Sequence, residues 1–193
     1  MHVTIPITTF ILLASSTIAA PLESRQSTLN PWQLDSLSTF SPSGCPGNYP
    51  WLTITASLTD PNTVNLGTSP NDNSTVTVPS GAQGLNCEAK WIYGEKPFGR
   101  SWPCDNSGLA QGWWTLEIEE TDDFSVAKFD AKFTRVAEVS YQGSSYRKDY
   151  EGSAHFEVGD NLGGQCGGSG VCSWQLKGEL APYDVQQQEI DAE

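Results

Sequence analysis

The chain has 193 residues, of which 23 are acidic and 10 are basic, so its formal net charge is −13. Such an acidic surface repels phosphate backbones and anionic lipids, and no basic stripe offsets it. We therefore expect neither nucleic acid nor a membrane as a partner. About 170 residues remain once a cleaved leader is removed, which is the size of one domain with its own core.

The N-terminal residues have the pattern of a secretory signal peptide. The apolar stretch from Ile5 to Ile18 is too short and too interrupted to span a bilayer, which takes about 20 apolar residues, and it ends in small residues. We expect cleavage after Ala19, so that residues 1–19 are the signal peptide and the mature protein is secreted and extracellular. Residues 20–30 form a short N-terminal segment, in which a second cleavage after Arg25 would remove a propeptide.

Residues 31–182 are predicted to form one β domain. Apolar and polar side chains alternate with a period of two in six segments: 51–58, 75–78, 114–118, 126–133, 154–158 and 174–178. Turn-forming pairs such as Gln142-Gly143 lie between them, and no segment has a sustained helical period. This pattern predicts an all-β fold, an antiparallel β-barrel or sandwich. Residues 183–193 are acidic and rich in glutamine, and we expect them to form a flexible tail.

Five cysteines are expected to be oxidised wherever geometry allows, because the chain is secreted. Counting alone does not fix which of them pair. Cys166 and Cys172 flank a glycine-rich loop flexible enough for a short bridge, and Cys87 and Cys104 would close a loop of about 17 residues, worth roughly 3 kcal/mol. Cys45 is then left over, either buried and free or joined to another chain. The cysteines lack paired CxxC spacing and the mature chain has one histidine, so we expect no metal site.

Residue patterns provide one modification site and no catalytic site. Asn73-Ser74-Thr75 is an acceptor sequence in a polar loop, so we expect glycosylation at Asn73. His155 should face water with Ser153 and Glu157, and no GxSxG motif accompanies it.

Two carboxylates make glycoside hydrolysis an alternative to a function without catalysis. Glu117 and Glu119 share one face of a strand roughly 7 Å apart, a spacing that a glycosidase uses. A solvated strand face explains them more simply. We therefore expect no catalytic residue and no cofactor.

Seven tryptophans are many for a chain of this length. Exposed aromatic rings can stack on sugars, so a secreted carbohydrate-binding or cell-wall glycan-active protein is an alternative function. Trp113 and Trp114 point to opposite faces of one strand, and at least one of them should lie in the core.

Several segments resemble one family of secreted fungal proteins. They are Ala20-Pro21-Leu22-Glu23-Ser24-Arg25-Gln26, an early strand with Trp32, Leu34 and Phe40, Asp60-Pro61-Asn62-Thr63, Cys87 with Trp91, and Trp102-Pro103-Cys104. Over about residues 20–182 this pattern is similar to the Alternaria major-allergen family of small β-barrel proteins.

The resemblance implies a β-barrel with disulfides Cys87–Cys104 and Cys166–Cys172, and a disulfide-linked homodimer through Cys45. It also implies an allergen-like effector or elicitor that acts without catalysis in virulence, plant defence or cell death, with host extracellular defence proteins as partners. The turn-forming residues around Cys45 place it in a surface loop, which agrees with an intermolecular bond.

Overall fold

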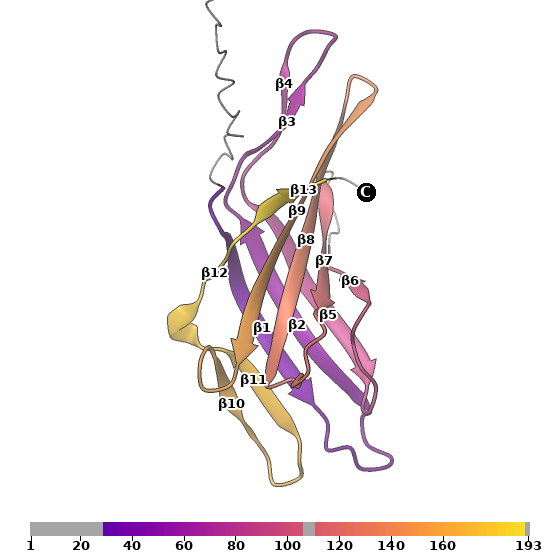
Figure 1. The fold of residues 1–193 in the computed structure, drawn as a ribbon, viewed down its shortest axis with the longest axis vertical. Helices are drawn as coiled ribbons and strands as arrows, with labels where there is room; N and C mark the ends of the chain where they lie inside the picture. Colours follow the sequence, from indigo (N-terminus) through magenta and orange to yellow (C-terminus); the bar gives the residue numbers. More distant parts are fainter. Residues whose placement is uncertain (1–28, 106–110, 192–193) are drawn as a thin grey trace, which may run out of the picture.

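The computed structural model describes residues 29–105 and 111–191; the expected signal peptide and both cleavage sites lie outside these ranges. The described residues form two antiparallel sheets and a separate hairpin, with a short 3-10 helix at Gly178–Leu180. Figure 1 shows the sheets as two layers, with β1, β2 and β5 in one and β7, β8 and β9 in the other.

The first sheet runs in the order β10–β11–β1–β2–β5, and β12 pairs with the beginning of β1. Its strands are β1 (Trp32–Ser41), β2 (Trp51–Asp60), β5 (Ala82–Ile92), β10 (Leu162–Cys166), β11 (Cys172–Leu176) and β12 (Tyr183–Val185). The second sheet runs in the order β13–β9–β8–β7–β6. Its strands are β6 (Ser101–Pro103), β7 (Gly112–Ile118), β8 (Lys128–Tyr141), β9 (Ser144–Glu157) and β13 (Gln188–Ile190). The hairpin consists of β3 (Val64–Thr68) and β4 (Thr75–Val78).

The all-β antiparallel prediction is confirmed, and the architecture is a sandwich, not a barrel. Within the described ranges, β5 forms no strand ladder with the second sheet, and the backbone pairing at this edge is limited to an isolated bridge between Leu85 and Asp105. The sheets therefore stay open and pack face to face.

Alternation along the strands fills the core between the sheets. Ile54, Ala56 and Leu58 of β2 are buried, and their neighbours point outward. On β8 the odd-numbered residues Phe129, Ala131 and Phe133 are buried, as predicted. The two layers also meet through aromatic side chains: Trp32 of β1 and Trp114 of β7 pack edge to face with ring centroids 4.7 Å apart. Each such side chain removed from water contributes about 1.5–3 kcal/mol.

A buried ion pair crosses the same core. Asp60, at the end of β2, pairs with Arg135 of β8, and the two side chains are 0% and 1% exposed. The guanidinium carbon of Arg135 also lies 5.5 Å from the centroid of the Trp114 ring. The other carboxylate oxygen of Asp60 accepts hydrogen bonds from the backbone and side-chain nitrogens of Asn62, at 2.8 and 2.7 Å. Burial lowers the pKa of Arg135 to about 10, so the guanidinium stays charged at neutral pH.

The β8–β9 hairpin is longer than the sequence pattern predicts. Its turn, Gln142-Gly143, has positive φ at both positions, 48° and 82°, which is the backbone of a type I′ turn. The hairpin extends beyond the sheet and packs near β3–β4, as Figure 1 shows at its upper end. There the Tyr141 hydroxyl and the Gln142 amide donate hydrogen bonds to Asp72, at 2.9 and 2.8 Å.

The C-terminal segment is a strap between the two sheets, and the prediction of a flexible tail over residues 183–193 is wrong for its described part. β12 pairs with β1 of the first sheet, and β13 pairs with β9 of the second. Val185 is fully buried. Gly152 of β9 makes room for the crossing, because a Cβ at this position would lie 2.5 Å from the carbonyl oxygen of Gln186.

Candidate recognition surface

The structure contains two disulfides, Cys87–Cys104 and Cys166–Cys172, the pairs expected from the sequence. The first joins β5 of the first sheet to the residue after β6 of the second, so it ties the layers together at one edge. The second closes the β10–β11 hairpin. Cys45 carries a free thiol and is exposed in the β1–β2 loop, so it is not buried.

A group of exposed and half-buried aromatic residues lies where β1, β2 and β5 meet this loop. We define the aromatic patch as Phe40, Tyr49, Trp51, Lys90 and Tyr93. Phe40 and Tyr49 pack edge to face with ring centroids 6.0 Å apart. The Lys90 ammonium lies 5.8 Å from the Tyr49 centroid and 5.5 Å from the Trp51 centroid. Tyr49 is 52% exposed and Tyr93 is 54% exposed, so these rings are not accounted for by core packing.

Strand register places the patch on the outer face of the first sheet. Thr53 of β2 lies directly between Phe40 of β1 and Lys90 of β5. Since Ile54 points into the core, Thr53 and its two cross-strand neighbours point outward. Trp51 occupies the next outward position of β2, opposite Ile92. The patch is therefore built mainly on regular strands.

Local contacts hold the loop part of the patch in place. The Tyr93 backbone nitrogen donates to the Pro50 carbonyl at 2.8 Å, which joins the end of β5 to the start of β2. The Tyr93 ring lies against Gly44, where an added Cβ would come within 2.9 Å of it, and Gly44 has a φ of 71°. A side chain at this position would push the ring away, so a glycine is required for the contact. Cys45 follows directly and thus borders the patch.

A row of hydroxyl groups continues from the patch along β2. We define the hydroxyl row as Thr53, Thr55, Ser57 and Thr59, all of which are partly exposed. Thr59 donates to Asp35 at 2.7 Å, and Ser57 accepts from the Asn86 backbone at 3.1 Å.

The outer face of the second sheet carries ion pairs instead. His155 is exposed, as predicted, and its Nδ1 lies 2.5 Å from Asp130 while its Nε2 lies 3.4 Å from Glu157. The hydrogen bond with Asp130 raises the pKa of His155. Because both ring nitrogens face carboxylates, neither is placed to accept a proton from a serine.

The carboxylates considered for glycoside hydrolysis have a similar setting. Glu117 pairs with Lys132 across the strands at 3.0 Å, and this contact raises the pKa of the lysine. Glu117 is therefore part of an ion-paired strand face.

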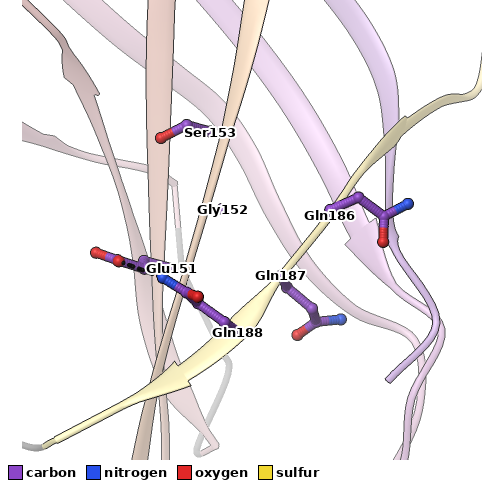
Figure 2. A pocket seen from close by; sticks show the side chains of 6 residues that line it. All are labelled: Glu151, Gly152, Ser153, Gln186, Gln187 and Gln188. Carbon is purple, nitrogen blue, oxygen red and sulfur yellow. Dashed lines mark hydrogen bonds between the residues drawn. The ribbon is translucent and has the colours of Figure 1, made fainter. Parts of the chain in front are cut away.

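Two hollows occur in the described structure besides the patch. A small one of about 200 Å³ lies under the C-terminal strap and is lined by Glu151, Gly152, Ser153, Gln186, Gln187 and Gln188. Figure 2 shows Gln188 reaching Glu151, a hydrogen bond of 2.9 Å, while Gln187 points away from this pair.

A larger hollow of about 580 Å³ lies between β3, β9 and the strap. Its charged groups, Lys148 and Glu189, neutralise each other at 2.9 Å. Burial raises the pKa of its Tyr150 to about 12, so this phenol stays neutral. In each hollow, the charged groups of the lining are thus bound to other lining residues.

Other candidate residues lie apart from the patch. Trp114 is in the core, whereas Trp113 is 40% exposed on the second sheet, with the Arg147 guanidinium 5.6 Å from its ring centroid. Asn73 is exposed in the β3–β4 loop, where an attached glycan would meet solvent.

Comparison with protein-family models finds no match, and comparisons with curated proteins and with solved structures find none either. In the described part of the chain, no helix is long and apolar enough to cross a membrane. The same part contains no group of three or more His, Cys, Asp or Glu residues placed to hold a metal ion.

Sequence reasoning did not single out the aromatic patch. The alternation of β2 could have placed Trp51 outward, because Leu52 and Ile54 define the opposite face. Its neighbours could not be found in this way. Tyr49 belongs to a loop, and Lys90 is joined to it only by the register of β5 on β2.

Proposed function

We propose that the protein is a secreted, non-catalytic recognition protein of the effector or elicitor type, and that it engages its host through the aromatic patch. The observation that carries this proposal is the pair of rings around Lys90, of which Tyr49 is exposed and Trp51 is half-buried. Tryptophan and tyrosine side chains dominate binding energy at interfaces, since they supply large, rigid contact surfaces. The strand pairing and the hydrogen bond from Tyr93 to Pro50 hold these rings ready, which reduces the entropy lost on binding.

The setting of the polar residues supports a role without catalysis. His155 and Glu117 are engaged in ion pairs on the opposite sheet. The leader and the two disulfides agree with an extracellular destination. The resemblance to fungal secreted proteins makes plant tissue the first host to test.

Leaf infiltration with purified protein tests the proposal. We expect wild-type protein to change cell death or defence output, and Trp51→Ala to reduce this response at least tenfold at equal dose. Trp113→Ala is the matched control, because it removes an exposed tryptophan from the other sheet. Circular dichroism and thiol counting must show that both variants are folded and oxidised. Equal responses to wild type and Trp51→Ala, or no response to any of the three, would contradict the proposal.

A further inference from the structure

The two outer faces of the sandwich differ in how their charged groups are arranged. On the second sheet, outward side chains form ion pairs, including Lys132 with Glu117 at 3.0 Å and Lys128 with Asp123 at 2.7 Å. On β2, an interior strand of the first sheet, every outward side chain from Trp51 to Thr59 is uncharged. The flanking strands do carry charges, because Glu88 and Lys90 of β5 lie opposite Thr55 and Thr53, and Asp35 of β1 accepts from Thr59. The uncharged surface is therefore a single row along β2, bordered by charged groups.

We infer that this face binds a neutral β-1,4-linked glucan, which stacks on the aromatic patch and extends along the hydroxyl row. The inference rests on the proposed function, because it names the ligand class of the same patch. A pyranose ring presents C–H groups on its faces and hydroxyls around its rim. It therefore needs apolar rings beside hydrogen-bonding groups, and both occur here within one sheet face.

The aromatic part of the surface suits the faces of the sugar rings. Tyr49 and Trp51 flank Lys90, with the ammonium within 5.8 Å of both ring centroids. Their rings supply apolar surface, and the ammonium can donate hydrogen bonds to rim hydroxyls. Phe40 packs edge to face on Tyr49 and so fixes the orientation of that ring.

The polar part of the surface suits the rim. Side chains at alternate positions of a strand stand about 7 Å apart on one face, so the hydroxyl row offers donors and acceptors at regular intervals. The hydroxyls of Thr53 and Thr55 make no hydrogen bond to another described residue, which leaves them free for a ligand. At the far end, Thr59 is already engaged by Asp35 at 2.7 Å. The free hydroxyls are therefore the ones next to the rings.

Charge and shape select among polysaccharides. The net charge of −13 repels a polyanion such as polygalacturonate. The face is made of paired strands, so it fits an extended, flat chain better than a helical one. A β-1,4-linked glucan is both neutral and extended.

Calorimetric titration of the secreted protein with cellohexaose tests the inference. We expect saturable binding, weakened up to about tenfold by Trp51→Ala, since the stacking of one ring accounts for as much as an order of magnitude in affinity. Thr53→Val keeps the shape and strand propensity but removes a hydroxyl, and we expect it to weaken binding about threefold. Trp113→Ala should bind as wild type does. Chitohexaose and polygalacturonate serve as competing ligands.

Three outcomes overturn the inference: no binding of cellohexaose, tighter binding of chitohexaose or polygalacturonate, or equal loss with Trp113→Ala. Its failure can be told apart from failure of the proposed function. If the leaf response depends on Trp51 but the protein does not bind cellohexaose, the glucan inference is wrong and the proposed recognition function stands. If cellohexaose binds in a Trp51-dependent way but no leaf response occurs, the proposed effector function is wrong and the glucan site stands.

Discussion

Replacing Arg135 with methionine should lower the stability of the fold more than any surface substitution does. The guanidinium is 1% exposed and its partner Asp60 is fully buried, so Arg135→Met leaves an unpaired carboxylate in the core. Breaking a buried ion pair on one side costs about 3–5 kcal/mol. For a domain of this size, each kcal/mol lowers Tm by roughly 2–4 °C, so we expect a loss of about 6–20 °C.

The double variant Asp60→Asn/Arg135→Met separates the charge effect from packing. An asparagine keeps an oxygen for the two hydrogen bonds from Asn62, while the buried charge disappears. We expect the double variant to recover at least half of the stability lost in Arg135→Met, measured by urea and thermal unfolding at pH 7.

A pH series adds a signature that packing alone cannot produce. An unpaired buried carboxyl has a raised pKa, and protonation relieves its burial. The single variant should therefore approach wild-type stability as pH falls from 7 to 5, and the double variant should not change relative to wild type. A loss below about 1 kcal/mol in Arg135→Met, or a double variant less stable than the single one, would refute this reasoning.

Three further predictions concern the strap, the histidine and the free thiol. Gly152→Val should destabilise the protein by about 1–3 kcal/mol, because the new side chain meets the strap. Gly178→Ala, which meets nothing within 4 Å, should change stability by less than about 0.5 kcal/mol. NMR titration should find a raised pKa for His155 in the wild type and a lower one in Asp130→Asn, which removes the partner carboxylate. The contact between His155 and Asp130 therefore stabilises the fold fully at low pH, and this contribution is lost as pH rises through the pKa of His155 in the folded state. On non-reducing gels we expect a dimer that Cys45→Ser abolishes; a monomer with one titratable thiol would contradict it.

Local sequence patterns were sufficient to predict the strands that have one face in the core of the sandwich. β2 and the first half of β8 alternate strictly, and the buried faces are those that the sequence indicates. The turn at Gln142-Gly143 is also local, since its positive φ values favour a glycine. Loop length likewise favoured the short bridge between Cys166 and Cys172.

The features that sequence reasoning missed depend on long-range pairing. Residues 183–190 are polar apart from a few positions, and only their pairing with β1 and β9 gives them structure. Their single fully buried side chain, Val185, gives no periodic signal. The second half of β8 and the first half of β9 similarly lack a clear apolar alternation, because they extend beyond the core as a two-stranded ribbon.

The contacts that join the two sheets explain why the proposed recognition surface lies at the beginning of β2. The strap crosses between the sheets near Gly152, and the Asp60–Arg135 pair links them at the same end of β2. The patch is at the opposite end of β2, where Trp51 begins the strand. Rings exposed there can be replaced without disturbing the buried ties, because Trp51 and Asp60 are separated by the whole strand. A surface free to change its side chains while the fold stays fixed is the condition under which recognition specificity can vary.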